Sequence, residues 1–227
     1  MIEKLHQSGF AVGNPELPAS SLDELCSTAF DGGGPGSRCL LGVPSVRSAA
    51  VRLYDWLIRS GAIETRGVAV QAIAFDKRDG TNWKVTWHQD LLFPFAERVH
   101  EAGFELQCIK AGVHYARPPR TILEGMLAVR VHLDDCDENN GPLRVSPGSH
   151  LEGVIPSNMI GDRVQALGDV TVCAKRGEAI LMRPLTLHAS SKAAIPRHRR
   201  VLHFVFSNQT LPSALWHSSV GPDGMNR

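Results

Sequence analysis

The stretch RRVLHFVFS, residues 199–207, decides the fold class. Its β-branched and aromatic residues favour a strand, and successive side chains of a strand point to opposite faces. One face then carries Arg199, Val201, His203, Val205 and Ser207. An arginine that points into a protein interior needs an anionic partner, because an unpaired buried charge costs much free energy. The stretch therefore predicts a buried strand with one polar face.

Further strand-like runs follow the first third of the chain. They are separated by Gly, Pro, Asn and Asp, which favour turns, and comprise GVAVQAIAF (67–75), WKVTWHQ (83–89), MLAVRVHL (126–133), VTVCA (170–174) and EAILMRP (178–184). Residues 1–64, by contrast, are mostly helical by pattern. Helices first and many short strands afterwards predict a mainly β protein with flanking helices (α+β), built around a β-sandwich or barrel.

Two helices are expected in the N-terminal part. The first covers residues 20–30 and begins with Ser20 or Ser21 as the capping residue. The second covers residues 45–61, where Ser45 caps an apolar stripe of helical period and Gly61 ends it. The glycine-rich segment between them, residues 31–39, is expected to be a flexible loop.

The composition is that of an ordinary globular protein of 227 residues, which fits a single domain. Lys and Arg total 24 against 23 Asp and Glu, which argues against a nucleic-acid partner. Five cysteines without a CxxC spacing argue against a disulfide framework or a structural zinc site, so a reducing cytoplasm is expected. We find no secretory signal, no membrane span and no glycine-rich nucleotide-binding motif.

Residues 91–121 hold few strand signals and are expected to form a long, lid-like loop. The segment mixes aromatic residues with Arg98, Lys110, Arg117 and Arg120. One interpretation is a lid that captures an anionic, partly apolar small molecule. The other is a solvated surface loop with a few anchoring aromatic residues, and the sequence leaves both open.

The motif WHQD, residues 87–90, places His88 and Asp90 two positions apart, so both point to one face of a strand. The same spacing recurs at His132 and Asp134. Two histidines and one carboxylate are the ligand set of non-haem Fe(II) enzymes that activate oxygen. Candidates for a third ligand are His150, His188, His198, His203 and His217.

His188 is notable because Arg199 follows it by eleven positions. A bound dicarboxylate would supply the anion that an inward arginine requires, since guanidinium is shaped for bidentate carboxylate binding. If the strand register slips by one residue, Arg200 becomes the inward residue instead.

Taken together, WHQD at 87–90, DENNGPLRVSPGSH at 137–150, His188 and Arg199 resemble the phytanoyl-CoA dioxygenase family. This is a branch of the Fe(II)/2-oxoglutarate-dependent oxygenases that includes ectoine hydroxylase. The resemblance implies a single domain whose core, residues 65–210, is a double-stranded β-helix, a jelly-roll or cupin-like barrel with iron at one mouth.

The resemblance also implies roles for individual residues. His88, Asp90 and His188 would hold Fe(II), Arg199 and Ser190 would bind the distal carboxylate of 2-oxoglutarate, and Gln71 would contact the same co-substrate. The implied activity is hydroxylation of a C–H bond of a small molecule by dioxygen, with release of succinate and CO2. His132 then belongs to a strand that leads into a structural turn and not to the metal.

Two other functions remain as alternatives. One is a cupin-type metalloenzyme that does not use 2-oxoglutarate, but such an enzyme has no need of Arg199. The other is a non-catalytic small-molecule-binding protein of the same fold, against which the intact ligand set argues. The sequence does not identify the substrate, and contacts from Lys84 or Arg130 to the co-substrate or substrate also remain open.

Overall fold

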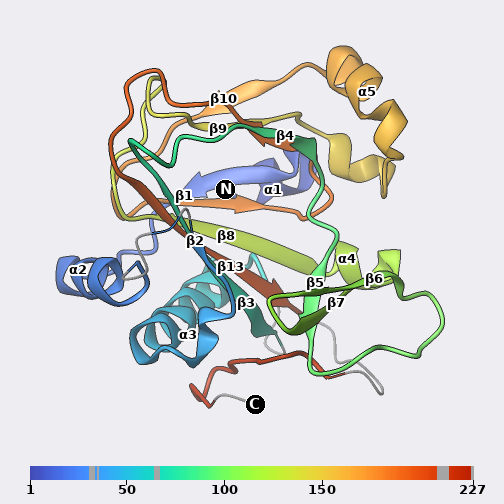
Figure 1. Ribbon diagram of the computed structural model, residues 1–227, viewed down its shortest axis with the longest axis horizontal. Helices are drawn as coiled ribbons and strands as arrows, with labels where there is room; N and C mark the ends of the chain where they lie inside the picture. The colour runs from blue at the N-terminus through green and yellow to red at the C-terminus, as the bar shows by residue number, and fades with distance from the viewer. Residues whose placement is uncertain (31–33, 35, 64–66, 209–214, 226–227) are drawn as a thin grey trace.

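The computed structural model describes residues 1–30, 34, 36–63, 67–208 and 215–225. Two antiparallel sheets form the centre of the molecule (Figure 1). The expected domain bounds at residues 64–65 and 210 lie outside the described residues, as do positions 31–33 and 35 of the expected loop.

The larger sheet has six strands, which come from both ends and the middle of the chain. Their order across the sheet is β1 (Phe10–Gly13), β11 (Ala179–Met182), β8 (Met126–His132), β13 (Arg199–Ser207), β3 (Val68–Lys77) and β2 (Gly36–Ser37). All five strand-like runs beyond 199–207 contain a strand, so this part of the sequence-based prediction is confirmed.

The smaller sheet has the order β10 (Val170–Val172), β9 (Leu143–Val145), β12 (His188–Ser190) and β4 (Val85–His88). A buried apolar cluster joins the two sheets, with Phe10, Ile180 and Met182 from the larger one and Leu143 and Val145 from the smaller. Two sheets packed in this way form the double-stranded β-helix, so the predicted fold class is confirmed.

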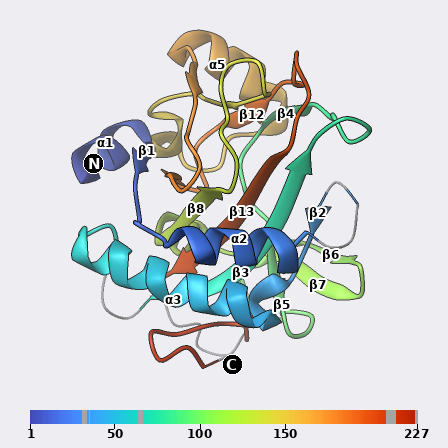
Figure 2. The same ribbon diagram turned by 90° about the vertical axis from the view of Figure 1, so that its left-hand side faces the viewer.

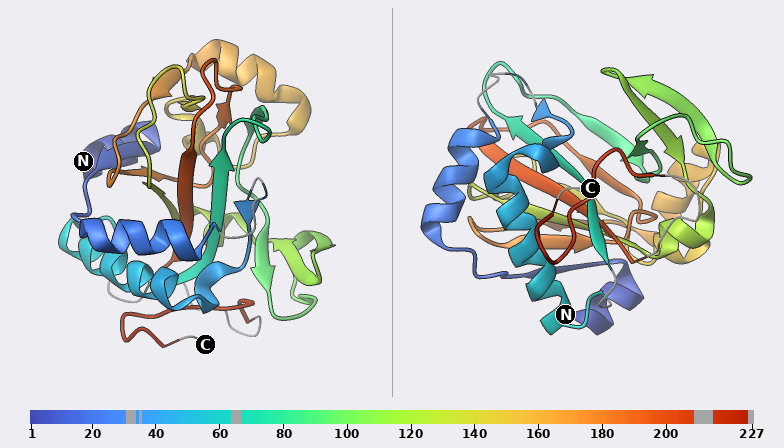
Figure 3. Two further views of the ribbon diagram at one scale, coloured as in Figure 1. Left: turned by 60° about the vertical axis from the view of Figure 1, so that its left-hand side comes forward. Right: turned by 90° about the horizontal axis from the view of Figure 1, so that it is seen from below.

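Residues 91–121 differ from the expected structureless loop. They contain a third, three-stranded sheet of β5 (Phe93–Phe95), β7 (Val113–Arg117) and β6 (Glu105–Lys110), which projects from one side of the barrel (Figure 3). The strands were missed because β5 has only three residues and contains Pro94, and because β6 is mostly exposed and has no buried face. Phe95 packs edge-on against Phe104 and anchors this sheet in the core.

The helices are α1 (Ile2–Ser8), α2 (Ala19–Thr28), α3 (Pro44–Arg59), α4 (Arg120–Glu124) and α5 (Ile160–Leu167). Short 3-10 turns are η1 (Leu40–Gly42), η2 (Ser149–Glu152) and η3 (Ser157–Met159). Both predicted N-terminal helices exist, but their expected caps are wrong. Pro18 and Val43 precede the helices, and the Ser45 hydroxyl instead hydrogen-bonds Thr28 Oγ1 at 2.7 Å, which ties α3 to α2.

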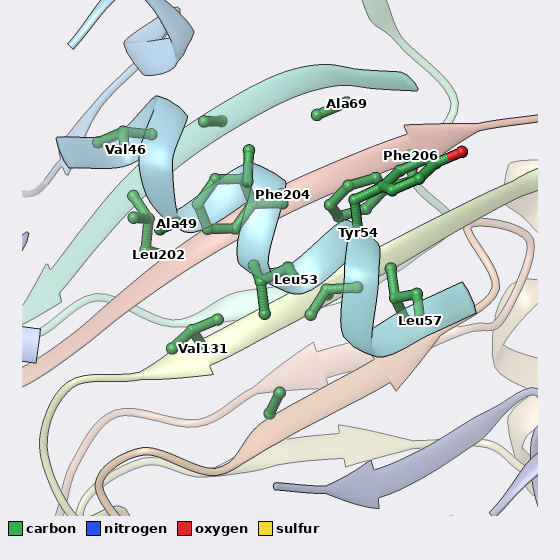
Figure 4. Packing of buried hydrophobic residues seen from close by; sticks show 14 of the residues in the cluster. Val46, Ala49, Leu53, Tyr54, Leu57, Ala69, Val131, Leu202, Phe204 and Phe206 are labelled. Carbon is green, nitrogen blue, oxygen red and sulfur yellow. The ribbon is translucent and has the colours of Figure 1, made fainter. Parts of the chain in front are cut away.

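Helices α2 and α3 lie side by side across the outer face of the larger sheet (Figure 2). Figure 4 shows the packing, with Leu53 and Leu57 of α3 turned toward Phe204 and Phe206 of β13. These side chains are at most 1% exposed, so the hydrophobic effect fixes this face of β13 against the helices and leaves its other face to the barrel interior. No helix within the described ranges is both long and apolar enough to cross a membrane.

Candidate metal centre and co-substrate pocket

His88, Asp90 and His188 converge at one mouth of the barrel. His88 ends β4 and His188 begins β12, and the two strands pair with these residues directly opposite each other (Figure 2). Their imidazole rings lie 4.2 Å apart between centroids. Asp90 follows β4, where its backbone N–H donates to the carbonyl of Pro184 at 2.9 Å.

The ligand atoms of these three residues all lie within 4.8 Å of one another. His88 Nε2 is 3.7 Å from Asp90 Oδ1, and His188 Nε2 is 3.8 Å from Asp90 Oδ2. Within the described part of the chain, no other group of three or more potential ligands is brought together. The buried Oδ2 atom of Asp90 forms no hydrogen bond with any described residue, which fits a carboxylate that holds a cation.

Backbone carbonyls orient both histidines. Nδ1 of His88 lies 2.8 Å from the carbonyl of Thr86, and Nδ1 of His188 lies 3.0 Å from that of Thr186. Because a carbonyl only accepts, each Nδ1 carries the hydrogen and each Nε2 presents its lone pair to the centre. Two such nitrogens and one carboxylate fit Fe(II).

The protonation states suit metal binding. Burial lowers the pKa of His188 to about 4, so its imidazole is neutral at pH 7. Burial alone would raise the pKa of the Asp90 carboxyl, but the imidazoles of His188, His203 and His88 outweigh it and lower that pKa to about 2. The centre therefore offers two lone pairs and a negative charge.

Gln89, between His88 and Asp90, points the opposite way and anchors the segment. Its amide nitrogen donates to the carbonyls of Gly153 and Leu185 at 2.7 and 2.6 Å, and its oxygen accepts from the N–H of Ile155 at 2.8 Å. All its hydrogen bonds reach backbone on neighbouring loops, so Gln89 fixes the position of the His88–Asp90 pair.

His203 approaches Asp90 from β13 but is not part of the three-residue group. Its Nε2 is 3.8 Å from Asp90 Oδ2, while Arg130 Nη1 lies 3.1 Å from its Nδ1. An arginine only donates, so Nδ1 is the acceptor and Nε2 carries the hydrogen. Burial and the charge of Arg130 together lower the pKa of His203 to about 3, so this neutral ring faces the carboxylate with its N–H.

Arg199 is the inward residue of the pair predicted from the sequence. It is 4% exposed, and its Nη1 donates to the carbonyl of Gly141 and to Ser190 Oγ at 3.3 Å. Gly141 has φ +61°, and an added Cβ would lie 2.8 Å from the carbonyl oxygen of Ser191, so only glycine fits there. Arg200 points outward and binds both carboxylate oxygens of Asp134.

A cavity of about 550 Å³ joins the metal centre to Arg199. Its lining includes Ser190 and Gln71, which are both buried. Gln71 Oε1 forms no hydrogen bond among the described residues. The three metal-ligand candidates and the three predicted co-substrate residues thus share one cavity.

The other histidines serve elsewhere. His132 is buried in β8, and neither ring nitrogen forms a hydrogen bond with a described residue. His150 Nε2 bonds the carbonyl of His6 at 3.0 Å, and His198 pairs with Asp76. His217 joins β5 through its backbone N–H. Of the five candidates for a third ligand, only His188 lies with His88 and Asp90.

The basic residues predicted to capture a substrate divide into two sets. Arg117 pairs with Glu105 and Arg120 with Glu124, and neither lines the cavity. Lys110 and Arg130 do line it, as does Arg38, which the sequence did not point to, whereas Arg98 is exposed and lies outside it. Lys84 is exposed and lies outside it. Arg117 and Arg120 each already pair with a glutamate, so neither charge is available to attract a substrate.

Lys77, at the end of β3, is a residue that the sequence analysis missed. Its side chain is fully buried, and its Nζ donates to Ser190 Oγ at 2.7 Å and to the carbonyl of Ser191 at 2.6 Å. It lies opposite Arg199 in the β3–β13 register. Only this register places the lysine beside the cavity, and no local sequence signal predicts it.

The fold and the ligand set define a class of protein, the metal-binding jelly rolls. A family model described as phytanoyl-CoA dioxygenase matches residues 49–201, more than half of the chain. The chain therefore belongs to the phytanoyl-CoA dioxygenase family, as the sequence motifs predicted. Membership makes it a non-haem iron dioxygenase that depends on 2-oxoglutarate. A search of curated protein sequences found no match.

Solved structures share the fold. EctD from S. alaskensis, solved with 2-oxoglutarate and 5-hydroxyectoine, is 20% identical with a TM-score of 0.63, and the match covers 91% of this chain and 74% of that one. The non-haem α-ketoglutarate-dependent epimerase SnoN from nogalamycin biosynthesis is 17% identical with a TM-score of 0.64, covering 91% and 81%. The carbocyclase SnoK from the same biosynthesis is 11% identical with a TM-score of 0.66, covering 91% and 82%. At these identities the likeness shows the fold alone.

Proposed function

We propose that the chain hydroxylates a C–H bond of an anionic small molecule, with Fe(II) held by His88, Asp90 and His188. The observation that carries the proposal is the shared cavity, in which this trio and Arg199 line one space. When bound, ferrous iron with 2-oxoglutarate and dioxygen supplies the power to oxidise a C–H bond and converts 2-oxoglutarate into succinate and CO2. An aspartate as the third ligand leaves no place for a halide and supports hydroxylation.

The protein's own residues bind and orient the two organic molecules. Arg199 and Ser190 bind the distal carboxylate of 2-oxoglutarate, and Gln71 offers an unused amide oxygen to the same cavity. Arg199 has no carboxylate partner among the described residues, although it is only 4% exposed. A dicarboxylate supplies the missing counter-charge, which supports 2-oxoglutarate use over a cupin-type reaction without it.

The charge of the cavity supports an anionic substrate. Its lining contains Arg38, Lys110, Arg130 and Arg199, whereas Asp90 is the only acidic residue among the described residues that line it. The positive charges of Arg199 and the ferrous ion offset the two negative charges of 2-oxoglutarate and the negative charge of Asp90. Arg38, which follows β2, Lys110 at the end of β6 and Arg130 of β8 remain to attract an anion.

We further propose that the chain is one domain that works in the cytoplasm, with residues 91–121 acting as a lid over the cavity. Leu106 and Lys110 of this segment line the cavity, which supports the lid. The five cysteines are all free, which supports a reducing compartment. Dioxygen and the substrate would enter beside this segment.

Turnover tests the proposal. The purified protein is loaded with Fe(II) under anaerobic conditions, and 2-oxoglutarate, air and fractions of a cell metabolite extract are then added. Succinate should form in step with 2-oxoglutarate loss, most in fractions that bind an anion-exchange resin, and chromatography with mass spectrometry should show a product heavier by one oxygen atom. No succinate and no oxidised product with any fraction would favour a non-catalytic binding protein, and an oxidised product without succinate would favour the cupin-type enzyme.

A further inference from the structure

Lys77 is a fully buried lysine without an ion pair in the described part of the chain. Its side chain is 0% exposed, and the β3–β13 register sets it opposite Arg199. Both cations contact one hydroxyl, since Lys77 Nζ is 2.7 Å and Arg199 Nη1 is 3.3 Å from Ser190 Oγ. Two like charges this close are unstable in a buried site unless one is neutral or an anion joins them.

The hydrogen bonds of Lys77 match those of a neutral amine. Its Nζ has two acceptors, Ser190 Oγ and the carbonyl of Ser191, while the ring of Trp83 lies 5.5 Å from it. A neutral amine carries two hydrogens and an ammonium three. The third hydrogen of the charged form has no oxygen or nitrogen acceptor among the described residues.

Ser190 is turned into a hydrogen-bond donor by the same contacts. Its oxygen accepts from Lys77 and from Arg199, which occupies both lone pairs. Its own hydrogen must then be donated, and the protein acceptors in reach are longer contacts, Gly141 O at 3.2 Å and Ser191 O at 3.4 Å. A carboxylate placed beside Arg199 would be a stronger acceptor for this hydroxyl.

We propose that Lys77 is a positioning residue for the distal carboxylate of 2-oxoglutarate: it holds Ser190 as a donor and takes up a proton when the dicarboxylate binds. The inference rests on the proposed function, because it assumes that Arg199 binds this carboxylate. The proton comes from solvent and remains on Lys77 as long as the dicarboxylate is bound. No bond to the co-substrate forms or breaks.

The charges around Lys77 give the sign of the effect. Burial, together with the charges of Arg199 and Arg130 and against the opposing effect of Cys136, lowers the pKa of Lys77 to about 7. The other groups that contact its ammonium, Ser190, the Ser191 carbonyl and Trp83, carry no charge. A bound carboxylate adds a negative charge and raises the pKa of Lys77. Binding should therefore take up about half a proton at pH 7 and nearly one proton at pH 8, and affinity should fall roughly tenfold per pH unit above 7.

Calorimetry measures this directly. 2-Oxoglutarate is titrated anaerobically into the Fe(II)-loaded protein between pH 7 and 9, in buffers of low and high ionisation enthalpy, so that the heat difference gives the protons taken up. Lys77→Met should abolish the uptake, weaken binding at least tenfold at pH 7 and make the affinity nearly independent of pH. Lys84→Met, the same change at an exposed lysine outside the cavity, should behave as the wild type.

The outcomes are distinguishable. A wild type without proton uptake and with constant affinity from pH 7 to 9 overturns the inference even if Lys77→Met does not fold. Uptake that persists in Lys77→Met also overturns it. Arg199→Gln tests the underlying proposal separately: if it binds 2-oxoglutarate as tightly as the wild type, the proposed function fails, whereas if only Lys77→Met is without effect, the inference alone fails.

Discussion

The two faces of β13 are equally buried and chemically opposite. Leu202, Phe204 and Phe206 face α3 and are 0–1% exposed, whereas Arg199 and His203 face the cavity and are 4% and 3% exposed. On the helix side, burial removes apolar surface from water and stabilises the fold. On the cavity side, burial lowers the pKa of both Arg199 and His203 and so opposes their charged forms.

This difference separates stability from function within one strand. Apolar residues on the helix side hold β13 in place. On the cavity side, the charged forms of Arg199 and His203 remain unfavourable until a ligand binds. Changes on the first face should lower stability and leave ligand affinity intact. Substitutions on the cavity face should lower ligand affinity and leave stability largely intact.

The largest effect is expected at the metal centre. Asp90→Ala removes the carboxylate from the trio, so Fe(II) binding and 2-oxoglutarate turnover should fall below detection, because two imidazoles do not hold the metal. Metal titration and succinate assay check this. Asp134→Ala is the matched control from the second His-x-Asp pair, whose carboxylate binds Arg200, and it should keep normal metal affinity although it loses some stability.

The next largest effect belongs to the helix side. Phe204→Ala should lower the free energy of unfolding by about 3–5 kcal/mol, since it leaves a cavity under α3, and should lower Tm by roughly 10 °C. Thermal melts followed by circular dichroism check this, with Phe204→Leu as the milder control. An unchanged Fe(II) affinity at low temperature would support the separate roles of the two faces. A large loss of affinity would contradict them.

A moderate effect is expected at His203. His203→Phe keeps a ring beside Phe75 but removes the donor facing Asp90, so Fe(II) affinity should fall about 10–100-fold, as is common when a group behind a metal ligand is lost. Tm should fall by a few degrees, because the buried Arg130 Nη1 loses its acceptor on His203. His132→Phe, a buried histidine outside the trio, is the control and should leave affinity within twofold. Equal losses in both variants would contradict a specific role for His203.

The smallest effect is expected outside the barrel. Arg117→Ala and Arg120→Ala break exposed ion pairs to Glu105 and Glu124, worth about 0–1 kcal/mol each, and should change neither stability nor substrate affinity measurably. Lys110→Ala, on the cavity wall, should instead weaken the binding of an anionic substrate. Steady-state kinetics with the identified substrate check this contrast, and a large KM effect from Arg117→Ala would restore the earlier hypothesis of capture by that residue.

The parts of the fold that the sequence predicts are those with long, periodic patterns. The ten residues of β3, the nine of β13 and the sixteen of α3 are each long enough for the period of their side chains to be recognised. Strands β9 and β12 have three residues each and lack such a pattern. His188 was therefore predicted by its spacing to Arg199 and by family resemblance, without recognition of its strand.

The prediction of site residues from the sequence has the same limit, because only local patterns can be recognised. The His88-x-Asp90 spacing predicts two neighbouring ligands because i and i+2 share a face of a strand. Lys77 and the Arg130–His203 contact depend instead on which strands become neighbours across β3, β13 and β8. That choice is made by tertiary packing, and no local pattern encodes it.

The central claim is that one metal ion lies between three side chains with a dicarboxylate anchored by Arg199. Anomalous diffraction from crystals soaked with Mn(II) and 2-oxoglutarate tests it most directly. We predict one strong metal peak bonded to His88 Nε2, His188 Nε2 and an Asp90 oxygen, with the distal carboxylate on Arg199 and Ser190. A peak elsewhere, or a dicarboxylate whose distal end avoids Arg199, would contradict the account.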